Sequence, residues 1–214
     1  MDPQANDIDS YIEFANVKGM EIKYVIDTHV HADHVSGGHQ LAQLAGADYC
    51  LHEAADVAFD FTSLKSDQKL DLGNVSIRVL HTPGHTPESI CLLVTDKTRG
   101  PEPWFLLTGD TLFVGAIGRP DLPGNIEESA AQLFRSLHEK VLALPETLEI
   151  YPAHFSGSLC GAGLSGKPMS TLAFEKRWNQ SLTLDREAFI EKMTSTSPPK
   201  PADMEAVLRA NRQA

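Results

Sequence analysis

The segment THVHADH, residues 28–34, places three histidines and one aspartate within six positions: His29, His31, Asp33 and His34. It follows residues 22–26, a short β-branched run that is typical of a strand. In a loop after a strand these side chains face different directions, so one loop can supply two adjacent metal positions. Imidazole suits zinc or iron, and a carboxylate adds charge that holds a divalent ion. The segment predicts a metal site open to substrate; the alternative is a polar surface loop or helix cap with incidental histidines.

Three polar residues further along the chain also follow predicted strands. His85 lies in HTPGHTPES, where Pro83 and Gly84 force a turn that exposes the next side chain. Asp110 ends the apolar run WFLLTGD, where a carboxylate is costly unless it is paired, hydrogen-bonded or bound to metal. His154 follows a strand and a proline in YPAHFSGS. All three are candidate ligands, with a surface turn for His85 and a cap or turn for Asp110 as alternatives.

Of the other four histidines, His81 shares the HTPGHTPES segment with His85, whereas His39, His52 and His138 have no such setting. We expect His81 to pack at a strand end or to hydrogen-bond near the site. Surface or packing positions are expected for His39, His52 and His138.

Strand and helix patterns alternate along the chain, which predicts a layered α/β architecture. Strands are expected at residues 22–26, 48–51, 75–80, 90–94, 104–108 and 147–151. Asn6 or Asp7 is expected to cap a first helix that stops at Gly19, and Gly46 to close a second over residues 37–45. A long amphipathic helix is expected over residues 126–144. Helices are also expected from residue 171 to the end, broken by the proline-rich residues 197–201.

Length and charge narrow the class of protein further. The 214 residues fit one domain, residues 1–214, with residues 197–214 as a C-terminal arm. A net charge of −11 argues against nucleic acid and anionic lipid as partners. The three cysteines, Cys50, Cys91 and Cys160, are too few and scattered for a disulfide framework. Without a secretion signal or an apolar stretch of about 20 residues, a cytoplasmic protein that does not span a membrane is expected.

The order THVHADH, HTPGHT, LLTGD and YPAH resembles the metallo-β-lactamase fold superfamily over nearly the whole chain. This resemblance implies a four-layer α/β/β/α sandwich with a metal site at one edge of the sheets. A first metal would be held by His29, His31 and His85. A second would be held by Asp33, His34 and His154, with Asp110 as a bridge.

Within the superfamily, residues 108–124, residues 151–161 and the later STLAFEKRWNQSL look most like the persulfide dioxygenases, especially those fused to a rhodanese domain. That likeness implies a single iron(II) per chain bound by His29, His85 and Asp110, with three positions left for a persulfide and dioxygen. The implied reaction oxidises the outer sulfur of a thiol persulfide to sulfite and returns the thiol. Hydrogen bonds to ligands or water would be the role of His31, Asp33, His34 and His154.

Several features depart from the pattern of that branch. Asp2-Pro3 stands almost first, so the N-terminal β-hairpin of that branch is expected to be missing. The sheet edge that the hairpin would cover is then unpaired, which favours a homodimer. Phe155-Ser156-Gly157 stands where relatives tend to carry polar or aromatic glutathione contacts, so the carrier thiol stays open among glutathione, coenzyme A and another low-molecular-weight thiol. No rhodanese domain is expected, so a separate rhodanese or sulfide-oxidising enzyme would supply sulfur.

Three residues and two further functions stay open at this point. Arg119 and Asp121 either hydrogen-bond to groups of the metal site or orient substrate near Asp110, with a surface pair as the alternative. Cys160 either senses or relays sulfur or packs in a turn. A two-zinc thioester hydrolase similar to glyoxalase II is the alternative enzyme. A non-catalytic sulfur-sensing or interaction module is the third interpretation.

Overall fold

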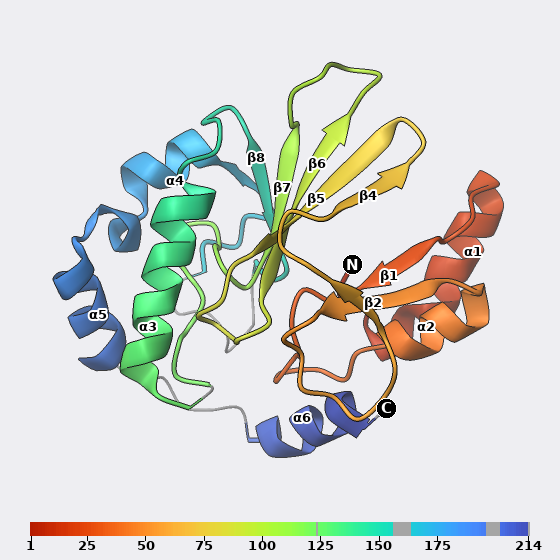
Figure 1. The fold of residues 1–214 in the computed structure, drawn as a ribbon, viewed down its shortest axis with the longest axis horizontal. Helices are drawn as coiled ribbons and strands as arrows, with labels where there is room; N and C mark the ends of the chain where they lie inside the picture. Colours follow the sequence, from red (N-terminus) through yellow and green to blue (C-terminus); the bar gives the residue numbers. More distant parts are fainter. Residues whose placement is uncertain (123, 156–163, 196–201, 214) are drawn as a thin grey trace. The chain divides into compact units, whose positions relative to one another are not determined.

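The computed structural model describes residues 1–122, 124–155, 164–195 and 202–213. The chain divides into two compact units, residues 1–64 with 201–214 and residues 65–200, and each is described by itself. Figure 1 shows a sheet with packed helices in each unit, which confirms the expected α/β class. Among the described helices, none is long and apolar enough to cross a membrane.

The first unit is built on a three-stranded parallel sheet in the order β1-β2-β3. Its elements are η1 (Ala5–Asp7), α1 (Ile8–Lys18), β1 (Tyr24–Ile26), α2 (Gly38–Ala45), β2 (Asp48–His52), β3 (Thr62–Leu64) and α6 (Met204–Gln213). Helix α2 connects β1 to β2 and buries Leu41 against Val25 and Leu51 of these strands. The loop from β1 to α2 carries the THVHADH segment, so the sheet delivers it at the end of a strand.

The ends of the first two helices test the expected caps. Asp7 stands at the N-cap position of α1, as one of the two expected residues, but its side chain makes no capping hydrogen bond to the helix. A single turn of 3-10 helix leads into α1 instead. Gly19 and Gly46 close α1 and α2 in the left-handed conformation, with φ of 61° and 65°, as predicted.

The second unit is built on a six-stranded sheet in the order β4-β5-β6-β7-β8-β9. Its strands are β4 (Lys69–Leu72), β5 (Val75–His81), β6 (Ile90–Asp96), β7 (Phe105–Gly109), β8 (Glu149–Pro152) and β9 (Ser170–Thr171). Its helices are α3 (Ile126–Arg135), η2 (Ser136–Val141), α4 (Leu172–Trp178), η3 (Gln180–Thr183) and α5 (Arg186–Ser195). Strands β7 and β8 run parallel, whereas all other neighbours in this sheet are antiparallel. The parallel pair brings the residues that follow β7 and β8 to one edge.

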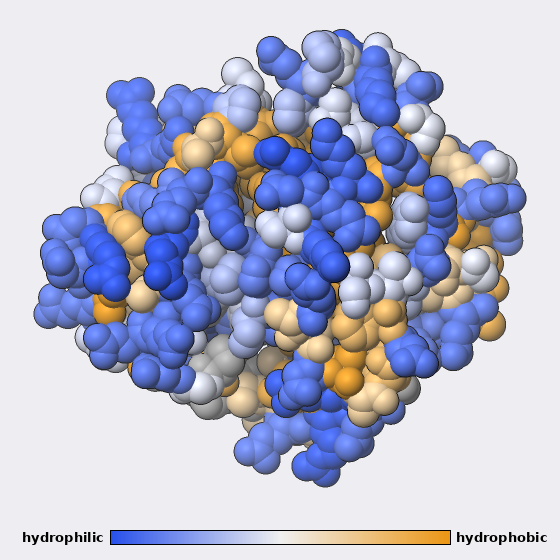
Figure 2. Space-filling view, in the orientation of Figure 1, coloured by the Kyte–Doolittle hydropathy of each residue, from blue (hydrophilic) through white to orange (hydrophobic). Residues whose placement is uncertain are grey.

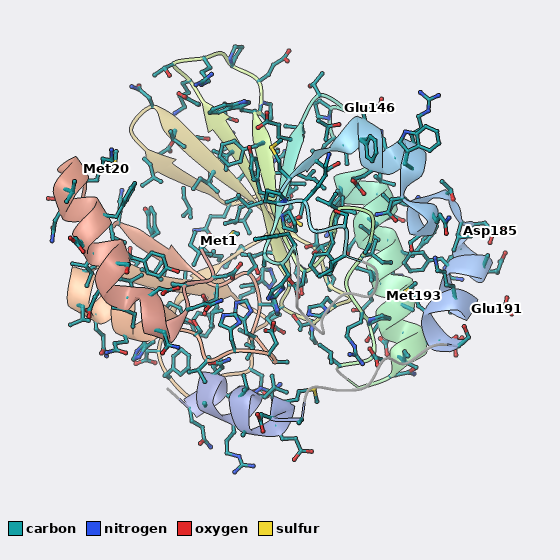
Figure 3. All side chains as sticks on the ribbon, turned by 180° about the vertical axis from the view of Figure 1, so that it is seen from behind. Met1, Met20, Glu146, Asp185, Glu191 and Met193 are labelled. Carbon is teal, nitrogen blue, oxygen red and sulfur yellow. The ribbon has the colours of Figure 1, made fainter. Side chains whose placement is uncertain are left out.

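The core of the second unit lies between this sheet and helices α3 and α5. Leu106 and Ile150 of the sheet pack with Leu133 of α3 and Phe189 of α5, and all four are fully buried. Figure 3 shows Met193 on the side of α5 that faces α3, where it packs on this core. Buried apolar area of this kind stabilises the frame that positions the loops.

The long helix expected over residues 126–144 is interrupted. It is α-helical only from Ile126 to Arg135 and continues as a π-helix over Ser136–Val141. Side chains of the π-helical turn bond to the end of β5 and to the turn that follows it: Lys140 donates to the backbone oxygen of His81, and Ser136 Oγ donates to that of Pro83. A π-helical turn widens the spacing of side chains, and such turns are frequent at functional sites.

The short strands β3, β4 and β9 were not expected from the sequence. They have only two to four residues each, too few for a pattern to stand out, so the pairing with neighbouring strands decides their conformation. The hydropathy of the surface on one face can be compared with the charge of the chain. Figure 2 shows a face that is mostly hydrophilic, in keeping with a net charge of −11.

Candidate metal centre

The loop between β1 and α2 gathers four of the predicted site residues in the first unit. His29 and His31 are each 1% exposed. The ring centroid of His31 lies 4.2 Å from that of His29 and 4.2 Å from that of His34. Ligand atoms of His31, Asp33 and His34 lie within 4.8 Å of one another. The loop therefore concentrates imidazole and carboxylate groups, the ligands that suit zinc or iron.

Asp2 holds this loop from the N-terminus, a role that the sequence did not reveal. Its carboxylate accepts hydrogen bonds from the backbone N–H of Thr28 at 2.6 Å, from the Thr28 hydroxyl at 3.1 Å and from His31 Nε2 at 3.1 Å. Burial opposes the ionisation of Asp2, but His31 and the Thr28 N–H outweigh it and hold the pKa of Asp2 below its usual value. Asp2 therefore stays charged and orients the ring of His31.

Asp27 lies directly before the motif and anchors the start of the loop. Its Oδ2 accepts hydrogen bonds from the hydroxyl groups of Ser36 and Tyr49, the latter at 2.7 Å. Burial raises the pKa of Asp27, although His31 and the two hydroxyl groups act in the opposite direction. These bonds tie both ends of the loop together, because Ser36 lies just before α2.

The hydrogen bonds also indicate which nitrogen of each ring would bind a metal. The Thr28 hydroxyl donates to Asp2, so His29 Nδ1–H donates to the same hydroxyl oxygen, 3.0 Å away. His31 donates through Nε2 to Asp2, and His34 through Nδ1 to Asp33 at 3.1 Å. A neutral imidazole that donates through one nitrogen carries its lone pair on the other. The candidate ligand atoms are therefore His29 Nε2, His31 Nδ1 and His34 Nε2.

The second unit brings together His85, Asp110 and His154. His85 lies in the turn between β5 and β6, Asp110 follows β7, and His154 follows β8. His154 Nδ1 lies 2.8 Å from Asp110 Oδ1, and His85 Nε2 lies 3.5 Å from Asp110 Oδ2. Two ligands about 2.1 Å from one ion, at right angles, lie about 3 Å apart. The spacing of His85 Nε2 and Asp110 Oδ2 fits two neighbouring ligands of a single metal.

The segment that reads GRPD fixes the orientation of His85. His85 Nδ1 donates to the backbone oxygen of Arg119 at 2.8 Å, which leaves the lone pair on Nε2. The Arg119 guanidinium pairs with Asp121 through two bonds of 2.6 and 2.7 Å, and its residue is 5% exposed. The sequence left Arg119 and Asp121 open between hydrogen bonding near the metal or orienting substrate, and a surface pair. The pair is buried, so the surface interpretation is wrong, and its backbone orients His85.

A cavity of about 360 Å³ lies beside the same segment. Residues 115–121 form one wall, and Trp178, Lys192 and Met193 contribute to the others. Buried Glu175 and Asn179 hold that wall, since Glu175 accepts from the Gly115 N–H and Asn179 donates to the Ala116 oxygen. The wall that orients His85 is therefore held on its far side by these two hydrogen bonds.

The remaining histidines take the roles expected of them. His81 Nε2 lies 2.8 Å from the Pro87 oxygen, as a hydrogen-bonding residue at a strand end. His138 stacks on Phe134 with ring centroids 4.0 Å apart, and His39 packs near Tyr49 and Phe59. His52 is buried at the end of β2, where its Nδ1 accepts from the Ala54 N–H. Cys160 lies outside the described residues.

The two described cysteines are expected to be unreactive. Burial raises the pKa of Cys91 to about 11 and that of Cys50 to about 12, and the thiolate is the reactive form of cysteine. In the folded protein at neutral pH, iodoacetamide is expected to leave both unlabelled, whereas unfolding in urea exposes them to full labelling. Peptide mass spectrometry measures this. Rapid labelling of either cysteine in the folded protein would show that it is accessible and reactive as a thiolate.

The sequence of this chain is similar to those of known proteins. The sequence pattern of the Metallo-beta-lactamase superfamily matches residues 2–154. The mitochondrial persulfide dioxygenase ETHE1 of Mus musculus is 30% identical over 194 residues, which is 90% of this chain and 69% of that protein. Glyoxylase B2 of Dictyostelium discoideum is 30% identical over 69% of this chain and 54% of that protein.

Solved structures show the same fold. A metallo-beta-lactamase structure from Staphylococcus aureus has a TM-score of 0.91 and 35% identity, covering 99% of this chain, which spans 64% of that one. The structure of ETHE1 from Myxococcus xanthus has a TM-score of 0.84 and 30% identity, covering 99% of this chain and 85% of that one. The α/β fold with two sheets flanked by helices, predicted from the motifs, is thereby confirmed.

Proposed function

This chain belongs to the metallo-beta-lactamase superfamily, and from that membership we propose that it is a non-haem iron(II) persulfide dioxygenase. The reaction converts a thiol persulfide, dioxygen and water into the thiol, sulfite and two protons. The outer sulfur loses four electrons, and dioxygen accepts them. Similarity to two proteins called ETHE1, one of them named a persulfide dioxygenase, supports this choice over the rest of the superfamily.

The observation that carries the proposal is the hydrogen bond from His154 Nδ1 to Asp110 Oδ1, 2.8 Å long. It occupies one oxygen of Asp110 and leaves Oδ2 beside His85 Nε2. Asp110 is then suited to bind metal through Oδ2 alone rather than to bridge two ions with its two oxygens. This arrangement favours one metal per chain.

We propose that His29, His85 and Asp110 hold the iron, as the family pattern implies. Two imidazoles and one carboxylate leave three positions for substrates, and iron bound there supplies the electron transfer between sulfur and dioxygen. His29 would bind through Nε2, because Nδ1 is bonded to Thr28. His85 would bind through Nε2, because Nδ1 donates to the Arg119 oxygen.

The other site residues then act on the ligands. His154 orients Asp110, and the Arg119–Asp121 pair holds the backbone that orients His85. Asp2 aims His31 through its ring N–H, and Asp33 does the same for His34. Such partners fix ring orientation and raise the basicity of nearby ligands. Glutathione persulfide or coenzyme A persulfide is the proposed substrate, with a separate enzyme as sulfur donor.

A second candidate function is a two-zinc thioester hydrolase. It is favoured by the grouping of His31, Asp33 and His34, whose ligand atoms lie within 4.8 Å of one another, and by similarity to Glyoxylase B2. In that enzyme these residues and His154 would bind a second ion. Paired zinc ions would activate water for attack on a thioester.

Oxygen uptake tests the proposed function directly. Protein purified and loaded with iron(II) under anaerobic conditions is expected to consume oxygen and form sulfite in equal amounts when glutathione persulfide is added. Coenzyme A persulfide serves as the second substrate, and S-lactoylglutathione with zinc-loaded protein tests the hydrolase. Hydrolysis of the thioester without oxygen uptake on either persulfide would replace the proposal with the second candidate.

A further inference from the structure

The last helix of the chain holds the motif loop through one asparagine. Asn211, in α6, donates from Nδ2 to the backbone oxygens of His31 and His34, each at 2.9 Å. Its Oδ1 accepts from the backbone N–H of Ser36 at 2.9 Å. The side-chain amide therefore uses both donors and its acceptor on a single loop, about 180 residues away in sequence.

The apolar residues of helix α6 that are shielded from solvent are Met204, which is buried, and Val207 and Leu208, which are half-buried. Only Met204 and Asn211 are buried among its ten residues. Its C-terminal end is also bonded to the segment between β2 and β3, because the backbone oxygen of Arg212 accepts from the Ala58 N–H at 2.8 Å. The polar bonds of Asn211 are thus a main attachment of the helix, and they connect it to the histidine-bearing loop rather than to the sheet.

The loop needs such attachments because its backbone forms neither helix nor strand. Between Asp27 and Gly37, its backbone bonds to other backbone in the described residues lie at its two ends: the Asp27 N–H donates to the Cys50 oxygen at 3.2 Å, and an isolated bridge joins Ser36 to Gln4. Asp2 bonds to the Thr28 N–H and to the ring of His31, while Asn211 bonds to the oxygens of His31 and His34. His31 is thereby held at its ring from the N-terminus and at its backbone from the C-terminus.

We propose that Asn211 is a positioning residue for the metal-binding loop. By fixing the carbonyl groups of His31 and His34, it sets the backbone that directs the rings of the THVHADH segment, including His29 two residues earlier. This inference rests on the proposed function only in taking the loop to bind metal. It assigns to the C-terminal arm a part in preparing the metal site.

Two substitutions test this role, with cobalt(II) as the probe. Asn211→Ala removes all three bonds, and Asn211→Asp keeps the shape but turns a carboxylate oxygen toward two carbonyl oxygens. Each is expected to weaken cobalt(II) binding about 10- to 100-fold, the effect of losing a residue that orients a metal ligand. The visible absorption of bound cobalt is expected to change in position and intensity, because the ligand directions change.

Matched variants in the same helix separate positioning from packing. Gln213→Ala removes an exposed amide two residues along the helix and is expected to bind cobalt(II) like the native protein. Met204→Ala loosens the apolar contact of α6 and is expected to lower the midpoint of thermal unfolding while it preserves the cobalt spectrum. If Asn211→Asp fails to fold, as circular dichroism would show, Asn211→Ala decides.

An Asn211→Ala protein that folds and binds cobalt(II) with native affinity and spectrum would overturn the inference. Because cobalt binding does not depend on the reaction, the result is independent of oxygen uptake. A protein that responds to Asn211 substitution but does not oxidise persulfides would refute the proposed function alone.

Discussion

Replacing Asp110 with asparagine is expected to abolish metal binding and turnover. The carboxylate is 2% exposed and lies between His154 and His85, and asparagine keeps its shape while it removes the charge. Loss of a residue that only supports a ligand weakens metal binding about 10- to 100-fold, so loss of the ligand charge is expected to exceed about 100-fold. Metal content per chain and the rate of oxygen uptake measure the two effects.

A matched control for this substitution is Asp71→Asn. Asp71 is paired with Lys97 at 3.3 Å on the surface, where its side chain is 69% exposed. Exposed pairs contribute about 0–1 kcal/mol, so this variant is expected to keep its metal and activity. An Asp110→Asn protein with native metal content would show that Asp110 is not a ligand.

Replacing Gly118 with alanine is expected to damage the same site through the backbone. A Cβ at Gly118 would lie 1.8 Å from the backbone oxygen of Asp110 and 3.3 Å from Cβ of His85. Neither neighbour can move without shifting a candidate ligand. Overpacking in a core usually costs about 1–3 kcal/mol, and a clash with backbone is expected at the upper end of that range. Urea unfolding and metal content measure the loss of stability and of the site.

Gly100→Ala provides the matched glycine substitution. No atom lies within 4 Å of a Cβ built at Gly100, and its φ is not positive. The free energy of unfolding is expected to change by less than about 0.5 kcal/mol. Equal stability and metal content in the Gly118→Ala and Gly100→Ala proteins would mean that residues 110 and 118 do not meet as described.

Local patterns predicted the strands that deliver the candidate ligands. The apolar runs before Asp110 and His154 form β7 and β8, and the alternating run before the HTPGH turn forms β5. These segments are long or apolar enough for pattern alone to decide their conformation. The sequence could not show that β7 and β8 are parallel neighbours, which is what brings Asp110 within 2.8 Å of His154.

The residues that hydrogen-bond to the ligand-bearing loop could not be predicted from the sequence, for a different reason. Asp2 and Asn211 lie at opposite ends of the chain, and Asn211 has no neighbour in sequence that suggests a site. Their contacts depend on how distant segments pack, and a single asparagine in a helix carries no local signal. The π-helical turn at Ser136–Val141 was missed because its residues have the apolar spacing of an α-helix.

Metal analysis tests the central claim most directly. Protein produced and purified without oxygen, with iron and zinc both present in the growth medium, would be measured by mass spectrometry for metal per chain. Binding of one iron through His29, His85 and Asp110 predicts about one iron and almost no zinc per chain. Two zinc ions per chain would contradict the dioxygenase and support the thioester hydrolase.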